Sequence, residues 1–228
     1  MESLQVMLLT SRGNVWERVY GREGPAWGSL PDLELIEYAE LIPRGRALDL
    51  GVGDGRNAFF LARMGLEVLG VDISEAAVEK CNKRAAELGL PVKAVVADLR
   101  DLEIEAGAYA CIVCSYVLPF LKRSEILALV ERIKRGLADG GLVFVRAFTT
   151  EDPSYQRFRA KGLPEVEEGT FYSPKFHTYF SFLRPGELRE LFAGLELVSY
   201  AEGYSLDITH DEPHYHGWAS LVARKRGH

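Results

Sequence analysis

The chain has 228 residues, of which 47% are hydrophobic, and it carries a net charge of −6. This composition is ordinary for a globular protein, and the length suffices for one substantial core. The acidic balance argues against a nucleic-acid partner bound through its phosphates. No apolar run reaches the length of a membrane span, and the patch at residues 7–9 is too short for a signal peptide. We therefore expect a cytoplasmic protein with no membrane or nucleic-acid partner.

The elements expected in chain order alternate between strands and helices. Residues 1–44 form an N-terminal extension, with a helix that Ser29 caps and Pro43 ends. Alternation of this kind predicts an α/β fold with a mostly parallel sheet and helices on both faces. No repeat or linker divides the chain, so we expect a single domain over residues 1–228. The predicted strands lie near 46–50, 66–71, 92–97, 109–114 and 142–148, and the helices near 56–64, 75–89 and 123–137.

The pattern changes after the fifth predicted strand. Residues 149–183 are aromatic and polar without a clear period, and a segment this long is usually a functional lid, here over the active site. A short helix follows from Arg184 to about Phe192. Two strands around 195–204 and 217–225 then form an antiparallel hairpin, and the loop between them is rich in histidine.

The sequence ALDLGVGDGRNAFFLA at 47–62 contains the most informative motif. An apolar strand is followed by glycines at positions 51, 53 and 55, and an apolar helical pattern begins directly after them. This order places backbone N–H groups and a helix N-terminus beside a ligand. Glycine is needed where the chain takes positive φ or where a β-carbon would keep a ligand away. Asp49 adds a carboxylate suited to an ammonium group or to bracing the loop.

Polar residues also end the strands that follow. Asp72 comes 23 residues after Asp49, close to the spacing at which an acid meets ribose hydroxyls in nucleoside-binding units. The third strand ends at Asp98 and Leu99, and the fourth leads into Ser115. Either acid alone could be an ordinary turn residue. In a parallel sheet, however, all of these groups fall at the carboxyl edge, where ligands bind.

The spacing D-x-G-x-G-x-G resembles motif I of the class I S-adenosylmethionine-dependent methyltransferases. The resemblance implies S-adenosylmethionine as cofactor and a Rossmann-like seven-stranded sheet closed by the C-terminal hairpin. It also assigns Asp98 to the adenine amino group. The residues that it implies for cofactor binding are Asp49, Gly51, Gly53, Gly55, Arg56, Asn57, Asp72, Ile73, Asp98, Leu99, Cys114 and Ser115.

Within that class, the chain resembles the tellurite-resistance methyltransferases and their small-molecule relatives over roughly residues 15–226. GDGRN at 53–57, Gly186-Glu187-Leu188-Arg189 and Ala223-Arg224-Lys225 carry part of this resemblance, as do Val117-Leu118 and Phe120-Leu121. One difference lies in the C-terminal segment, where Gly217 stands at the place of an expected arginine. The resemblance implies methyl transfer to a small-molecule acceptor, anionic or chalcogen-containing.

Histidine is the side chain best suited to act as a base near neutral pH. We expect catalytic residues at His210, His214 and His216. Three roles remain open for this H-x-x-x-H-x-H pattern: substrate binding or base chemistry, which we favour, a structural loop, and metal coordination. Our prediction includes no bound metal. Tyr116, His177 and Arg184 are the candidates for substrate binding.

Two other classes of protein share parts of this pattern. A nicotinamide-dependent dehydrogenase would have G-x-G-x-x-G, but Arg56 occupies the last glycine position here. A non-catalytic S-adenosylmethionine-binding protein would keep motif I, because this motif indicates binding and not turnover. Cys111 and Cys114 form a C-x-x-C, but residues three apart on a strand point to opposite faces. We therefore expect two buried thiols rather than a metal or redox site.

Overall fold

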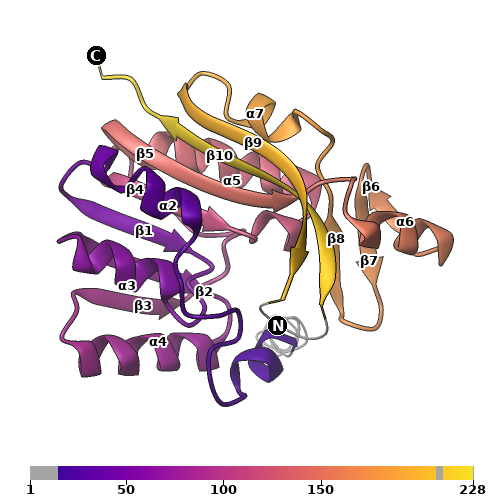
Figure 1. Cartoon of the computed structure of the whole chain (residues 1–228), viewed down its shortest axis with the longest axis horizontal. Coiled ribbons are helices and arrows are strands. Elements are labelled where there is room, and N and C mark those ends of the chain that lie inside the picture. The colour runs from indigo at the N-terminus through magenta and orange to yellow at the C-terminus, as the bar shows by residue number, and fades with distance from the viewer. Residues whose placement is uncertain (1–14, 209–212, 228) are drawn as a thin grey trace, which may run out of the picture.

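The computed structural model describes residues 15–208 and 213–227 (Figure 1). Its main sheet has seven strands in the order β3-β2-β1-β4-β5-β10-β9. The first five strands are parallel, and β10 runs antiparallel to both β5 and β9. The predicted α/β fold with a C-terminal antiparallel hairpin is confirmed. The strands are β1 (Arg46–Leu50), β2 (Glu67–Asp72), β3 (Val92–Val96), β4 (Tyr109–Ser115), β5 (Leu137–Phe148), β9 (Glu196–Asp207) and β10 (His214–Arg224).

Helices cover both faces of this sheet and bury two separate apolar clusters. One cluster receives side chains from α2 (Leu33–Glu37), α3 (Arg56–Arg63) and α4 (Glu75–Leu88). The other receives them from α5 (Arg123–Gly136) and α7 (Glu187–Leu191). Because both faces are covered, the central strands are apolar almost throughout, as in other parallel sheets.

The two cysteines of the C-x-x-C follow the predicted geometry. Cys111 belongs to the cluster under α3 and α4, whereas Cys114 belongs to the cluster under α5. Both thiols are free and fully buried. Their separation onto opposite faces of β4 confirms that they share no site.

The predicted lid has more regular structure than its sequence suggested. It contains α6 (Pro153–Ala160) and a separate antiparallel sheet of β6 (Glu165–Glu167), β7 (Thr170–Ser173) and β8 (Thr178–Ser181). This unit lies beside the main sheet, at the right of Figure 1. Aromatic rings hold it together, among them Phe158 and Phe180 at 5.1 Å between centroids. Strands of three or four residues are too short to show a clear alternation in sequence, which explains the missing period.

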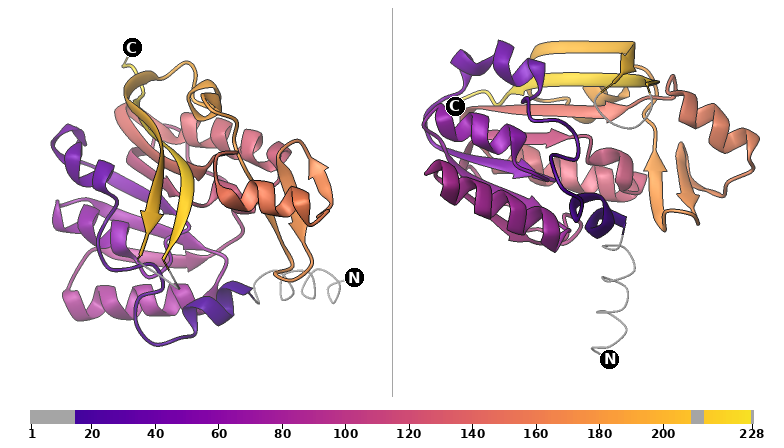
Figure 2. Two further views of the ribbon diagram at one scale, coloured as in Figure 1. Left: turned by 45° about the vertical axis from the view of Figure 1, so that its right-hand side comes forward. Right: turned by 60° about the horizontal axis from the view of Figure 1, so that its bottom comes forward.

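Two other boundaries differ from the sequence-based expectation. The N-terminal helix is short and begins after Asp32, not Ser29, and η1 (Ala39–Leu41) follows it. The hairpin strands β9 and β10 are longer than predicted, so His214 and His216 lie on a strand rather than in a loop. In Figure 1 and the left view of Figure 2, the hairpin extends from the sheet toward the side where the described part of the N-terminal segment begins. No helix within the described residues is both long and apolar enough to traverse a bilayer.

Candidate active site

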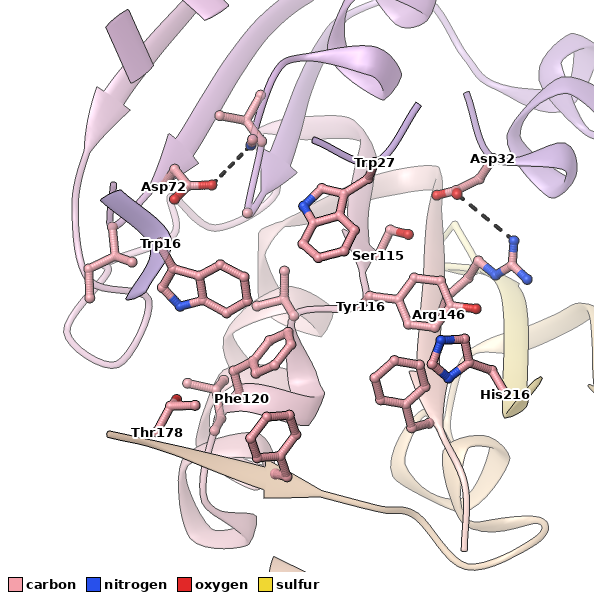
Figure 3. A pocket seen from close by; sticks show the side chains of 18 of the residues that line it. Trp16, Trp27, Asp32, Asp72, Ser115, Tyr116, Phe120, Arg146, Thr178 and His216 are labelled. Carbon is pink, nitrogen blue, oxygen red and sulfur yellow. Dashed lines mark hydrogen bonds and ion pairs between the residues drawn. The ribbon is translucent and has the colours of Figure 1, made fainter. Parts of the chain in front are cut away.

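A cavity of about 690 Å³ lies at the carboxyl edge of the sheet, within the size range of small-molecule sites. Loops after β1, β2, β3 and β4 form one wall. The N-terminal segment, the β7–β8 turn and the end of the β9–β10 hairpin line the other sides. In the view of Figure 3, Asp72 and Trp16 lie toward one end of the cavity, and Arg146 and His216 toward the other.

The glycine loop takes the conformation that its sequence predicts. Gly51, Gly53 and Gly55 have φ values of 72°, 51° and 88°, in the left-handed region where a β-carbon is strained. A β-carbon on Gly53 would also lie 2.6 Å from the hydroxyl oxygen of Tyr20. Gly51 and Gly53 line the cavity. The loop can therefore approach both a ligand and the N-terminal segment closely.

Asp72 is 7% exposed and lines the cavity beside this loop. Its two carboxylate oxygens accept hydrogen bonds from the backbone N–H groups of Gly53 (2.9 Å) and Ser74 (3.0 Å). Burial raises the pKa of this carboxyl group, and the backbone N–H groups of Ser74, Gly53 and Ile73 oppose that shift. Since each oxygen has a second lone pair, the carboxylate can also accept hydrogen bonds from a ligand.

Five other expected cofactor residues also line the cavity, namely Arg56, Asn57, Ile73, Leu99 and Ser115. Asp98 lines it too, but its carboxylate is paired with the guanidinium of Arg100, which the sequence did not indicate. Arg100 is therefore positioned to orient Asp98.

Asp49, Gly55 and Cys114 do not line the cavity, in contrast to the sequence-based expectation. The side chain of Asp49 is fully buried, and desolvation together with the nearby Asp32 raises its pKa to about 8. A β-carbon on Gly55 would meet the ring of Phe59 and the thiol of Cys81. These three positions therefore lie behind the cavity wall.

Arg56 and Asn57 attach the N-terminal segment to the glycine loop. Asp32 is buried, and its carboxylate accepts hydrogen bonds from Arg56 (2.8 Å) and from the Asn57 amide (3.0 Å). The Asn57 side-chain oxygen in turn accepts the backbone N–H of Asp32 at 2.9 Å. Sequence reasoning missed Asp32, because its partners are 24 and 25 residues away. It likewise missed the aromatic residues Trp16, Tyr20 and Trp27, which also line the cavity.

Arg146 on β5 is a further cavity residue that the sequence did not reveal. Its guanidinium lies 5.2 Å from the ring centroid of Tyr116 and 5.3 Å from that of Trp218. Among the described residues, its Nε is a buried donor without a hydrogen-bond partner. Tyr116 itself has a φ of 54°, which is rare for a non-glycine residue, and burial raises its pKa to about 12. Such backbone strain is typical of functional positions.

His216 lines the cavity opposite the glycine loop and stacks on Phe148, with 4.7 Å between ring centroids. Its Nδ1 lies 2.7 Å from a carboxylate oxygen of Asp152, which is 1% exposed. Its Nε2 lies 2.9 Å from Nε2 of His214. The structure thus joins two of the three predicted catalytic histidines in one pair, although His214 does not itself line the cavity. The third, His210, lies outside the described residues.

The two remaining substrate candidates have different surroundings. His177 has a φ of 50° on the β7–β8 turn and lines the cavity, although it is exposed. Arg184 lies outside the cavity with 56% of its side chain exposed, and it pairs with Glu168, Glu187 and Glu190. Arg184 thus lies apart from the cavity, in contrast to its expected place at the substrate, and its three carboxylate partners are the exposed Glu168 and Glu190 and the buried Glu187.

Comparison with known proteins identifies the relatives of this chain. The family model described as "Methyltransferase domain" matches residues 47–141. A carboxy-S-adenosyl-L-methionine synthase from Vibrio campbellii is 30% identical over 177 residues, which cover 69% of this chain and 70% of that protein. A probable S-adenosyl-L-methionine-dependent methyltransferase, TehB of Haemophilus influenzae, is 28% identical over 52% of this chain and 42% of its own length. The match to a carboxy-S-adenosyl-L-methionine synthase from Glaesserella parasuis covers 55% of that protein. The chain therefore spans about half the length of this synthase and of TehB.

Solved structures show the same fold. Crystalline TehB from Haemophilus influenzae superposes with a TM-score of 0.68 at 22% identity, over 94% of this chain and 67% of that one. A methyltransferase from Methanosarcina mazei gives a TM-score of 0.70 at 18% identity, over 87% of this chain and 100% of that one. The family model and the sequence identity to the synthases and to TehB show that the chain belongs to the class I S-adenosylmethionine-dependent methyltransferase family, whose cofactor is S-adenosylmethionine.

Proposed function

We propose that the protein transfers a methyl group from S-adenosylmethionine to a small-molecule acceptor. One observation carries this proposal: a single cavity joins the glycine loop and Asp72 at one end to Tyr116, Arg146 and His216 at the other. A methyl donor and an acceptor must meet in one enclosed space, because displacement requires the nucleophile within about 3–3.5 Å of the methyl carbon.

The cofactor would occupy the end of the cavity formed by the glycine loop. Asp72 would accept the ribose hydroxyls, since its oxygens keep lone pairs beyond the two backbone hydrogen bonds. Ile73, Leu99 and Ser115 would line the adenosyl site, and Asp98 would reach the adenine amino group while Arg100 holds its carboxylate. Arg56 and Asn57 would act indirectly, by fixing Asp32 and the N-terminal segment over the ligand.

The acceptor would occupy the other end. Arg146 contributes a guanidinium with one buried donor unpaired, Tyr116 contributes a hydroxyl, and His216 an imidazole. These groups favour an acceptor with an anionic or hydrogen-bond-accepting group near the reacting atom. The unit 149–183 with His177 would cover it as a lid. When bound, the sulfonium of the cofactor supplies the electrophilic methyl group, so the protein contributes alignment and exclusion of water.

Calorimetry with S-adenosylmethionine, S-adenosylhomocysteine and NAD tests the first half of the proposal. We expect the first two to bind and NAD not to bind. Binding of NAD without S-adenosylmethionine would contradict the proposal and favour a dehydrogenase. Mass spectrometry of ligands co-purified with the protein would then identify acceptors for transfer assays. Tight cofactor binding without transfer to any of them would favour a non-catalytic binding protein.

A further inference from the structure

The hairpin β9–β10 places three potential metal ligands on one of its faces. The register pairs His214 directly with Asp207 and His216 with Ser205. Residues opposite one another on paired strands point to the same face, and so do residues two apart on one strand. His214, His216 and Asp207 therefore converge because of the strand register alone.

We propose that Asp207, His214 and His216 bind a divalent first-row transition-metal ion. One ligand atom from each of the three lies within 4.8 Å of those of the other two. Nε2 of His216 lies 2.9 Å from Nε2 of His214 and 4.0 Å from a carboxylate oxygen of Asp207. Two ligand atoms bound at about 2.1 Å lie about 3.0 Å apart at a right angle and at most about 4.2 Å apart, so both distances are within reach of one shared ion.

Asp152 provides the support that metal-binding histidines usually have. Its buried carboxylate lies 2.7 Å from Nδ1 of His216, so Nδ1 carries the proton and Nε2 presents a lone pair. Asp152 is itself fixed, because it accepts hydrogen bonds from the backbone N–H groups of Ser154 (2.8 Å) and Gly217 (3.3 Å). A preset tautomer and ring orientation are required of a ligand but not of a surface histidine.

The charges and ligand types of the cluster favour such an ion. Two carboxylates, Asp152 and Asp207, flank two imidazoles, so a divalent cation would neutralise the group. Two imidazoles and one carboxylate suit zinc, iron, cobalt or nickel better than calcium or magnesium. Three protein ligands also leave coordination positions open, as in catalytic rather than structural sites.

The open positions would face the acceptor end of the cavity, because His216 and Asp207 both line it. This inference goes beyond the proposed function. An acceptor with a hydroxyl, thiol or carboxylate group could bind the ion directly.

Cobalt titration of the untagged 228-residue chain, first treated with a chelator and dialysed, tests the site. We expect one Co²⁺ per chain by calorimetry, together with a visible absorption band from nitrogen and oxygen ligands. His214→Ala and His216→Ala should each weaken binding by more than about 100-fold, because a direct ligand is lost. Asp152→Asn should weaken it roughly 10- to 100-fold, because only the orientation of His216 is affected.

His177→Ala is the matched control, since it removes a cavity histidine outside the cluster and should leave cobalt binding unchanged. Circular dichroism and S-adenosylmethionine calorimetry on every variant show whether the fold and the cofactor site survive. The inference is overturned if the wild-type protein shows no saturable cobalt binding, or if folded His214→Ala and His216→Ala proteins bind cobalt as the wild type does. Cofactor binding is measured separately, so failure of the metal site and failure of the proposed function give different results.

Discussion

The two ends of the cavity are built in different ways. At the cofactor end, backbone conformation and backbone donors shape the site: Asp72 accepts hydrogen bonds from the N–H groups of Gly53 and Ser74, and Gly51, Gly53 and Gly55 shape one turn. At the acceptor end, side chains from distant segments meet. Asp152 and His216 are 64 residues apart, and Arg146 lies between the rings of Tyr116 and Trp218. The first kind of site tolerates little change in the loop, whereas the second can change specificity without disturbing cofactor binding.

His216→Ala is the sharpest test of this division and has the largest expected effect. We expect turnover to fall roughly 10²- to 10⁴-fold, the usual contribution of a group that activates a nucleophile. Affinity for S-adenosylmethionine, measured by calorimetry, should stay nearly unchanged, because His216 lies at the other end of the cavity. Full activity of the folded variant would show that His216 has no role in binding or activating the acceptor.

Asp72→Ala should have the reverse pattern. We expect a loss of about 2–4 kcal/mol in cofactor binding, roughly 30- to 1,000-fold in affinity, because the ribose hydroxyls lose a charged acceptor. Asp101→Ala, at an exposed turn position, is the matched control and should bind as the wild type does. If calorimetry gives equal affinities for the two variants, Asp72 is only a turn residue at the end of a strand.

The buried Asp49 makes the stability of the fold depend on pH. Its pKa is about 8 in the folded protein, raised from 3.8 chiefly by desolvation. Between these values the unfolded chain is ionised while the folded chain keeps the proton, so stability falls as pH rises, by up to about 1.4 kcal/mol per pH unit. Denaturant unfolding from pH 5 to 8 should show that the free energy of unfolding of Asp49→Asn rises relative to that of the wild type as pH increases. The exposed Asp101→Asn should show no such trend, and a constant gain for Asp49→Asn would contradict this explanation.

Gly53→Ala separates backbone strain from crowding. Gly53 and Gly89 both have positive φ, but a β-carbon on Gly89 meets nothing within 4 Å. Gly89→Ala should therefore cost about 1 kcal/mol, and Gly53→Ala about 1–2 kcal/mol more, because of the clash with Tyr20. Adding Tyr20→Phe to Gly53→Ala should restore part of the lost stability in thermal melts, because the clashing hydroxyl is removed. Equal losses for the two glycine variants would mean that the N-terminal segment moves aside without cost.

Arg184→Ala should have the smallest effect. Its guanidinium is exposed and outside the cavity, and the buried Glu187 keeps Arg123 as a partner, so stability should change by less than about 0.5 kcal/mol. Turnover and the Michaelis constant for the acceptor should both stay at wild-type values. A raised Michaelis constant would instead show that Arg184 contributes to acceptor binding.

The sequence by itself determined the parts of this protein that depend on local pattern. Periodicity gave the order of strands and helices, and the fold that this order implies was confirmed. The glycine spacing predicted three residues of positive φ, and the strand ends predicted which edge of the sheet would bear Asp72, Asp98 and Ser115. These features follow from backbone conformation and strand alternation, which are properties of neighbouring residues.

Only the tertiary structure decided which residues from distant segments complete the cavity around the glycine loop. The length of β9 and β10 depends on how far the two strands can pair, so the sequence predicted a loop where His214 and His216 lie on a strand. Arg146 and Asp32 became cavity residues through partners far along the chain. Packing of the surrounding elements decided that Asp49 is buried behind the cavity wall whereas Ser115 lines the cavity. Such contacts depend on register and packing between distant segments, and no local pattern encodes them.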